Sequence, residues 1–180
     1  MLEKYYPYEY ARNVFAIDYK KLYAQGFRGL IFDIDNTLVH HGEPSTERVD
    51  KLFLYLKKIG FKTILLTNND ENRVQLFIKN IDTDYICDAD KPSPEAYLKA
   101  LEKLGLPKEQ TVSLGDQMFI DIVGANCVGI PTILVHYVKA PGEIWLGFKR
   151  YIEMAVMLVY RLRPKYTHRL GNIIKRGKRK

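Results

Sequence analysis

The sequence is poor in cysteine and histidine and has no long apolar run. Its two cysteines, Cys87 and Cys127, do not form a CxxC pair, and its four histidines lack the spacing of zinc ligands. No segment approaches the roughly 18 apolar residues of a membrane-spanning helix. The opening MLEKYYPYEY lacks the basic and apolar regions of a secretory signal. We therefore expect a reduced, cytoplasmic protein without structural zinc, a signal peptide or a transmembrane segment.

Acidic residues are missing from the last part of the chain. Residues 161–180 hold nine of the 28 Lys and Arg and no Asp or Glu, which leaves 19 basic against 21 acidic side chains before them. A near-neutral body with a cationic tail predicts peripheral contact with an anionic membrane, RNA or an acidic partner. A solvated, frayed terminus explains the same composition, so both interpretations stay open.

Short apolar runs alternate with segments of helical period. The runs predict buried strands at residues 30–34, 62–66, 85–87, 112–114 and 132–135. Helical spacing covers residues 46–59, 71–80, 94–104 and 120–128. This alternation predicts an α/β fold, a three-layer Rossmann-like parallel sheet of about five strands with helices on both faces.

The length and composition fit a single core, because 47% of the 180 residues are hydrophobic. We expect one domain over residues 1–163, in which residues 1–27 form a lead and residues from about 144 to 162 form a final amphipathic helix. The basic tail then covers residues 164–180.

The stretch GLIFDIDNTL places Asp33 and Asp35 directly after a buried strand. Side chains two residues apart on an extended chain point the same way, so the two carboxylates overhang one pocket and repel each other. Asp116 follows a second strand, and the carboxyl ends of parallel strands share one edge of the sheet. Three carboxylates there form an all-oxygen site suited to Mg²⁺, which would relieve the repulsion.

Groups that can hold an anion follow other strands. Thr67 supplies a hydroxyl, Asn68 a backbone amide near a helix start, and Lys91 a fixed positive charge. Together they can hold three phosphoryl oxygens while Mg²⁺ neutralises developing charge. The pattern predicts phosphoryl transfer from a phosphorylated substrate.

Four motifs occur in order along the chain: DIDNT at residues 33–37, LLTNN at 65–69, the lysine of KPSPEAY at 91, and GDQMFID at 115–121. Their order and spacing resemble those of the haloacid dehalogenase superfamily of phosphatases and are more specific than DxDxT alone. More narrowly, the whole chain resembles the YqeG family of bacterial type IIIA members. That family is related to mitochondrial, plant and fungal phosphatidylglycerophosphate phosphatases.

The resemblance implies a role for each acidic residue. Asp33 would be the nucleophile that forms an aspartyl phosphate. Asp35 would be the general acid for the leaving oxygen and then the base for the attacking water. The carboxylates of Asp33 and Asp116 and the backbone carbonyl of Asp35 would ligate Mg²⁺. Asp121 would lie outside the metal ligands and orient a metal-bound water or Lys91.

These residues also have structural explanations. Asp35 with Asn36 can form a turn, and Asp116 can cap the following helix. Several unrelated turn and cap requirements would not produce one ordered set, so we favour the catalytic interpretation. His40 and His41 follow the first motif and can reach a substrate, but we expect an ordinary surface loop there.

Many relatives insert a cap domain over the site, and this chain has no room for one. Only eight residues, 38–45, separate the first motif from the first long helix, and 23 residues separate Thr67 from Lys91. We therefore expect a capless enzyme whose active site is open to solvent. Such a site suits a large substrate that covers the pocket itself, such as a protein, a nucleic acid or a lipid head group.

The final helix allows two interpretations. An apolar stripe at helical spacing is formed by Phe148, Ile152, Ala155, Val159 and Leu162. Basic and acidic side chains lie away from this stripe: Lys149, Arg150, Glu153 and Arg161. Such a helix can pack on the sheet. Because basic residues follow it, it can also lie in a membrane interface.

We expect a Mg²⁺-dependent phosphomonoester hydrolase that dephosphorylates phosphatidylglycerophosphate at the inner membrane face. One alternative is a soluble phosphatase for a phosphosugar, a nucleotide or a phosphoprotein. A different class is a module that binds RNA or a ribosomal partner through its tail. The sequence does not indicate an oligomeric state.

Overall fold

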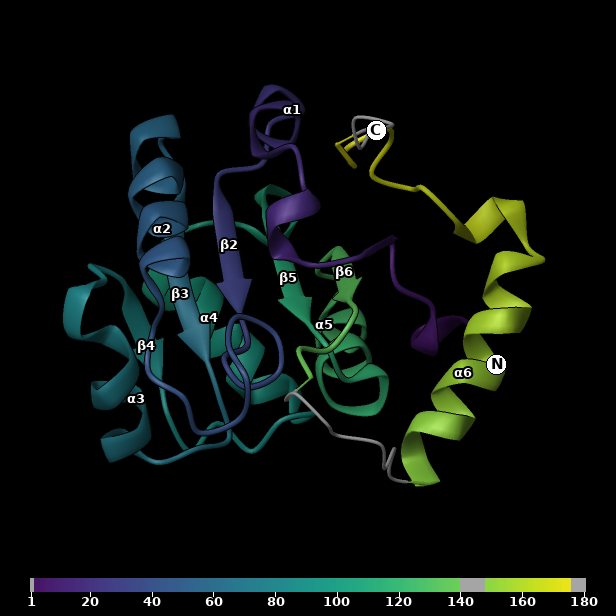
Figure 1. Cartoon of the computed structure of the whole chain (residues 1–180). Helices are drawn as coiled ribbons and strands as arrows, with labels where there is room; N and C mark the ends of the chain where they lie inside the picture. Colours follow the sequence, from purple (N-terminus) through teal and green to yellow (C-terminus); the bar gives the residue numbers. More distant parts are fainter. Residues whose placement is uncertain (1, 140–147, 176–180) are drawn as a thin grey trace, which may run out of the picture.

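A parallel β-sheet forms the centre of the molecule (Figure 1). The computed structural model describes residues 2–139 and 148–175, and for residues 148–150 only the backbone. Within this part the sheet has six strands in the order β1-β6-β5-β2-β3-β4. The strands are β1 Glu9–Ala11, β2 Gly29–Phe32, β3 Lys62–Leu66, β4 Asp84–Ile86, β5 Thr111–Gly115 and β6 Thr132–Val135.

The sheet corrects the expectation of about five strands, because β1 lies in the N-terminal lead. Its residues Glu9, Tyr10 and Ala11 contain no apolar run, and it pairs with β6 at the edge of the sheet. A strand of three residues gives almost no periodic signal. The other five strands lie where the apolar runs predict them, within two residues at each end.

The helices confirm the predicted alternation. They are α1 Tyr19–Ala24, α2 Glu47–Ile59, α3 Glu71–Phe77, α4 Pro94–Leu104, α5 Val123–Val128 and α6 Phe148–Arg161. α2 begins after Thr46, whose hydroxyl accepts a hydrogen bond from the amide of Val49 at 3.3 Å, and ends at Gly60 with φ +107°. Glycine adopts this left-handed conformation without the steric cost of a side chain.

Two helical predictions differ in detail from the structure. The segment predicted at 71–80 is α3 followed by a 3₁₀ turn at Ile78–Asn80. The segment predicted at 120–128 is a π-helical turn at Met118–Ile122 that continues into α5. The first residues expected in the final helix, 144–147, lie outside the described residues.

The helices cover both faces of the sheet and give three layers (Figure 1). Alternating strand residues point to opposite faces, so Phe32 packs on the Phe53 ring of α2 while Ile31 belongs to the second core, which includes Tyr97 of α4. α1, α2 and α3 contribute to the first core, and α4 and α5 contribute to the second. Hydrophobic burial on both faces is typical of parallel sheets and stabilises this arrangement.

The loops at the carboxyl ends of the strands stay short. The segment between β2 and α2 is a loop, and the segment between β3 and Lys91 holds only α3, the following turn and β4. Neither position carries a cap domain. Within the described ranges no helix is both long and apolar enough to cross a membrane.

The N-terminal lead packs against the segment after α6. Ile17 forms an antiparallel bridge with Ile174, and Ile173 and Leu170 are buried in the main core. The guanidinium of Arg169 lies 3.6 Å from the ring centroid of Tyr8. Residues 164–175, the first part of the predicted basic tail, are therefore packed on the body, while residues 176–180 lie outside the description.

Candidate functional site

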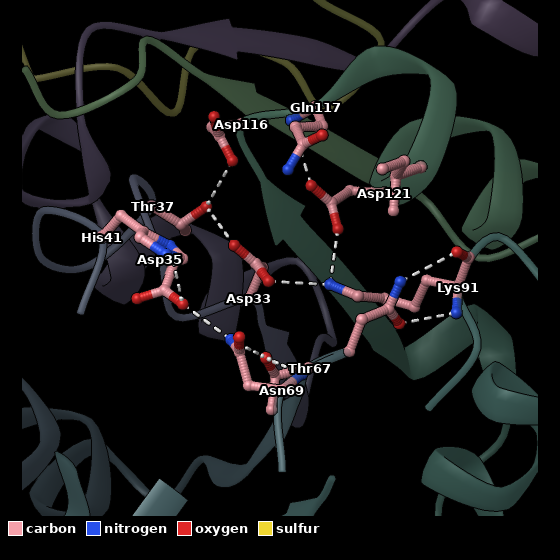
Figure 2. Close-up of polar contacts among 12 residues, drawn as sticks. Asp33, Asp35, Thr37, His41, Thr67, Asn69, Lys91, Asp116, Gln117 and Asp121 are labelled. Carbon is pink, nitrogen blue, oxygen red and sulfur yellow. Dashed lines mark hydrogen bonds and ion pairs between the residues drawn. The ribbon is translucent and has the colours of Figure 1, made fainter. Parts of the chain in front are cut away.

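The loop after β2 carries Asp33, whose carboxylate is buried and fixed on both oxygens. The ammonium of Lys91 donates to Oδ1 at 2.8 Å, and the hydroxyl of Thr37 donates to Oδ2 at 2.9 Å (Figure 2). The Thr37 oxygen also lies 3.3 Å from Oδ1 of Asp116, and because a hydroxyl has one proton it serves one carboxylate at a time. Thr37 thus connects the first motif to the fourth, although the sequence interpretation gave it no role.

Three acidic residues, one from the first motif and two from the fourth, meet at this point. Asp33, Asp116 and Asp121 are all buried, and each offers a carboxylate oxygen within 4.8 Å of the others. The structure thus brings Asp33 and Asp116 together as the sequence predicted, although they are 83 positions apart. With Lys91 as the partner ammonium, these four residues carry an excess of buried negative charge, which a hard divalent cation would offset.

Lys91 lies between two carboxylates. Its Nζ donates to Oδ1 of Asp33 at 2.8 Å and to Oδ1 of Asp121 at 2.7 Å, and the side chain is 3% exposed. Burial alone disfavours the charged ammonium, but the carboxylates of Asp121 and Asp33 outweigh it and raise the pKa of Lys91 above its ordinary range. Lys91 is therefore a permanent positive charge inside the site.

Asn68 holds the Lys91 loop through its side chain. Its Oδ1 accepts from the backbone amide of Lys91 at 2.7 Å, and its Nδ2 donates to the Lys91 carbonyl at 3.0 Å. The sequence interpretation gave Asn68 only a backbone contact to phosphate. This reciprocal pair orients the loop that presents the ammonium, and no local pattern in the sequence signals it.

The pKa of Asp33 is shifted by its surroundings. Burial raises the pKa of its carboxyl to about 6, with Lys91 acting in the opposite direction and Asp121 adding to the rise. The carboxyl is therefore mostly ionised at neutral pH.

Thr67 lies at the end of β3 and is buried. Its hydroxyl oxygen accepts from the Asn69 side chain at 2.8 Å and from the Asn69 backbone amide at 3.2 Å. Because the oxygen accepts both bonds, the hydroxyl keeps its own proton to donate. Thr67 thus suits the predicted contact with a phosphoryl oxygen.

Asp35 lies apart from the three clustered carboxylates, on the side of Asn69 (Figure 2). Its Oδ1 accepts from Nη2 of Arg73 at 2.6 Å and from the amide of Gly42 at 3.1 Å, and its Oδ2 accepts from Asn69 at 2.6 Å. Nδ1 of His41, on the predicted surface loop, lies 3.3 Å from Oδ2.

The hydrogen bonds set the charge state of Asp35. Burial favours the neutral carboxyl, but the hydrogen bonds from Arg73, Gly42 and Asn69 outweigh it and lower the pKa of Asp35. The sequence placed both carboxylates over one pocket. The structure shows Asp35 held by Arg73, a residue of α3 that the motif pattern does not include.

The π-helical turn after β5 places Asp121. Its Oδ2 accepts from the backbone amide of Gln117 at 3.0 Å, and the Tyr97 hydroxyl donates to its backbone carbonyl at 3.1 Å. A Cβ at Gly115 would lie 2.3 Å from the carboxyl carbon of Asp121. The glycine of GDQMFID is therefore required for the close approach of Asp121 to the end of β5.

A groove of about 680 Å³ starts at this site and runs under α6. Its lining includes Asp116 after β5, Leu134 of β6 and His136 after β6. Met154, Leu158 and Arg161 of α6 line it as well. The lining is mostly apolar, and its charged members besides Asp116 are Lys139, Glu153 and Arg161.

Comparison with known proteins extends these observations. The model of a family described as haloacid dehalogenase-like hydrolase matches residues 43–129, which include Lys91, Asp116 and Asp121 and follow Asp33 and Asp35. The chain is 36% identical over 159 residues to a probable phosphatase, YqeG, of Bacillus subtilis, with 87% of this chain and 92% of that protein covered.

Two further proteins are similar over most of this chain. The chloroplastic phosphatidylglycerophosphate phosphatase 1 of Chlamydomonas reinhardtii is 26% identical over 149 residues, which cover 76% of this chain and 55% of that protein. The solved structure of a putative 3-deoxy-D-manno-octulosonate 8-phosphate phosphatase from Vibrio cholerae is similar with a TM-score of 0.51 at 18% identity. The matched region covers 79% of this chain and 90% of the Vibrio cholerae chain. The structural likeness supports the fold.

Proposed function

Because the chain belongs to the haloacid dehalogenase-like hydrolases, and among them to the phosphatase family of YqeG, we propose that it hydrolyses phosphate monoesters through a phosphoaspartate on Asp33. The main support for this proposal is the buried carboxylate of Asp33, which Lys91 and Thr37 hold in place beside Asp116. An ionised carboxylate needs no base to act as a nucleophile, and the acyl phosphate that it forms is open to water.

The first half-reaction transfers the phosphoryl group to the protein. An oxygen of Asp33 forms a bond to phosphorus, the bond from phosphorus to the leaving oxygen breaks, and Asp35 gives a proton to that oxygen. Arg73 keeps Asp35 ionised in the structure described above. The negative charge of a bound phosphoryl group opposes the effect of Arg73 and raises the pKa of Asp35. Asp35 can then hold the proton that it gives to the leaving oxygen.

The second half-reaction releases phosphate. Asp35, now ionised, takes a proton from water, and the water oxygen attacks phosphorus as the bond to Asp33 breaks. The hydroxyl of Thr67, the backbone amide of Asn68 and the ammonium of Lys91 hold the phosphoryl oxygens in both steps.

Mg²⁺ fits the donor set of this site. The carboxylates of Asp33 and Asp116 and the backbone carbonyl of Asp35 would hold it, and these are hard oxygen ligands. The excess negative charge of the three buried carboxylates over the ammonium of Lys91 supports a divalent cation there. When bound, the ion offsets charge on the transferring phosphoryl group. Asp121 would orient Lys91.

We propose phosphatidylglycerophosphate as the substrate. Similarity to the Chlamydomonas enzyme over 76% of this chain supports this choice. So do the absence of a cap domain within residues 2–139 and the apolar groove that starts at Asp116. A small soluble phosphomonoester is the competing substrate class, and the same assay separates the two.

The test measures phosphate release from phosphatidylglycerophosphate in mixed micelles, a phosphosugar and a chromogenic aryl phosphate, with Mg²⁺ or with EDTA. We expect Mg²⁺-dependent turnover with preference for the lipid. Borohydride reduction of acid-quenched enzyme converts a phosphoaspartate to homoserine, so peptide mass analysis should find homoserine at position 33.

Asp33→Asn should lower turnover by at least about three orders of magnitude with an unchanged circular dichroism spectrum. Asp84→Asn is the matched control because Asp84 is an exposed carboxylate on β4, away from the site. Full-rate turnover by Asp33→Asn would overturn the nucleophile assignment. Faster turnover of the phosphosugar than of the lipid would overturn the proposed substrate.

A further inference from the structure

The outer face of α6 carries an apolar stripe. Four large side chains on this face are exposed by more than half: Tyr151 by 57%, Met154 by 60%, Leu158 by 62% and Leu162, directly after the helix, by 74%. Their positions i, i+3, i+7 and i+11 follow the period of a helix, and exposed Ala155 lies among them. Soluble surfaces carry single exposed leucines, but a contiguous apolar stripe marks an interaction site.

The opposite face of α6 is fixed on the body. Met157 and Tyr160 are buried against Tyr6, Met118 and Leu134. Glu153 accepts a hydrogen bond from the amide of Met118 at 2.9 Å. The stripe therefore faces outward because a second apolar face holds the helix in place.

This arrangement answers the question that the sequence left open. The sequence predicted one apolar stripe that either packs on the sheet or meets a membrane. In the structure both Ala155 and Leu162 of that predicted stripe are exposed, and Met157 and Tyr160, which lay outside it, are the buried anchors. The helix thus has one apolar face that packs on the body and a second apolar face that is exposed.

Basic residues surround the stripe at its C-terminal end. Arg161, Arg163 and Lys165 are exposed, and their cationic groups lie over the rings of Tyr10, Tyr6 and Tyr166 respectively. No Asp or Glu occurs from residue 161 to 180. An apolar stripe beside a field of positive charge is complementary to an anionic bilayer, in which acyl chains lie below negative head groups.

The groove under α6 links this face to the candidate catalytic site. Met154 and Leu158 belong both to the stripe and to the groove wall, and Asp116 lies in the same groove. Arg161 and Lys139 also line it. The groove therefore offers a lipid phosphate two cationic groups, with Glu153 as the one further acidic side chain among its lining residues besides Asp116.

We propose that α6 lies flat on an anionic lipid bilayer, with Tyr151, Met154, Leu158 and Leu162 inserted among the acyl chains and the groove open to the lipid head groups. The presentation of a lipid phosphomonoester to Asp116 through the groove rests on the proposed function. The binding of the bilayer by α6 does not.

The test uses the full chain and sedimentation with two kinds of vesicle, phosphatidylcholine alone and phosphatidylcholine with phosphatidylglycerol. We expect binding to the anionic vesicles that weakens as salt is raised, because part of the attraction is electrostatic. Leu158→Gln combined with Leu162→Gln should weaken binding by about tenfold or more per residue, since each substitution removes a large inserted apolar side chain.

Leu54→Gln combined with Leu98→Gln is the matched control. Leu54 and Leu98 are exposed by 65% and 54%. They belong to α2 and α4, which are drawn apart from α6 in Figure 1. This variant should bind vesicles as the wild type does. Thermal unfolding of both double variants identifies any loss of binding that comes from misfolding.

Three outcomes would overturn the proposal: no binding of the wild type to anionic vesicles, equal binding by the Leu158/Leu162 variant, or vesicle binding weaker than binding to a single-stranded RNA of equal charge. A dimer in sedimentation equilibrium that is lost in the same variant would also overturn it, by assigning the stripe to a second copy.

Turnover of a soluble aryl phosphate by the wild type separates the two proposals. Turnover without vesicle binding would contradict only the docking surface. Vesicle binding without turnover would contradict only the proposed activity.

Discussion

Arg73 donates from both Nη2 and Nε to Oδ1 of Asp35, at 2.6 and 3.3 Å, and so holds this carboxylate on the α3 side of the candidate site. The pair links the loop after β2 to α3, and both side chains are about nine-tenths buried. Its hydrogen bond is the largest of the contacts that lower the pKa of Asp35, the residue that we propose as general acid.

Replacing Arg73 with Gln should raise the pKa of Asp35, because the largest of the opposing hydrogen bonds is lost while burial remains. A general acid must be protonated, so the alkaline limb of the kcat profile should move to higher pH for a substrate with a poor leaving group. The measurement is kcat against pH for the wild type and Arg73→Gln. Arg48→Gln is the control, because Arg48 on α2 places its guanidinium over the Phe15 ring, and it should leave the profile in place. An unmoved alkaline limb in Arg73→Gln would show that the pair does not tune Asp35.

Mg²⁺ affinity should fall as the pH drops through about 6. Burial raises the pKa of Asp33 to about that value, so at pH 5 protons compete with the cation for its carboxylate, and at pH 7.5 they do not. The expected loss in apparent affinity between these pH values is about tenfold. Calorimetric titration of the metal-free protein measures it. Asp33→Asn should bind weakly at both values, and a pH-independent affinity in the wild type would argue against Asp33 as a ligand.

Lys91→Met should destabilise the fold strongly. The change leaves the carboxylates of Asp33 and Asp121 buried without the ammonium between them, and loss of one member of a buried ion pair costs about 3–5 kcal/mol. The loss should shrink towards pH 4, where the carboxyl of Asp33 takes up a proton. Urea unfolding at pH 7.5 and pH 4 tests both parts. Lys103→Met removes an exposed pair with Asp84 at 3.9 Å and should cost less than about 1 kcal/mol.

Gly115→Ala should impair both stability and turnover. The added Cβ would lie 2.3–2.4 Å from side-chain atoms of Asp121, so that carboxyl has to move away from Lys91. Overpacking of this kind costs about 1–3 kcal/mol, and displacement of a group that orients the site lowers activity by about 10–100-fold.

Gly26→Ala is the control for the Gly115 variant. Its φ of +100° makes alanine strained there, but no atom lies within 4 Å of the position that the added Cβ would take. We therefore expect a loss of stability without a loss of turnover. Equal activity of the two variants in the folded state would show that the position of Asp121 does not matter.

Much of the site could be predicted because several of its parts directly follow buried strands. Apolar runs located β2, β3 and β5, and parallel strands bring the residues after them to one edge. The meeting of Asp33 with Asp116 follows from that geometry. Lys91 comes after β4, a less buried strand of the same sheet, and reaches Asp33 from there. The apolar runs predict where the strands lie, and the strands in turn predict where the polar residues that follow them lie.

The contacts that refine the site could not be predicted in the same way. Arg73 reaches Asp35 from a helix 38 positions away, and Asn68 holds the backbone of Lys91 across 23 positions. Such pairs depend on side-chain directions that no periodicity encodes. Thr37 is different, since it lies inside the DIDNT motif, two residues after Asp35, and that position was the available signal.

β1 escaped prediction for a further physical reason. Its three residues are held by pairing with β6 and by the burial of Glu9, whose carboxylate accepts from the Tyr10 amide at 2.9 Å and lies 3.0 Å from the His168 ring. Glu9 is only 1% exposed, but a glutamate in a sequence predicts a surface position because acidic residues are rarely buried. Its partner comes from the segment after α6.

The contact between the two ends of the described chain sets the order in which the molecule can assemble on the ribosome. Residues 33–121, which include every side chain of the proposed chemistry, emerge before β6, the partner of β1, and well before Ile174, which pairs with Ile17. A nascent chain can therefore complete the centre of its sheet while its own beginning is still unanchored. Among the described residues, those that are translated first are therefore among the last to be fixed in the fold.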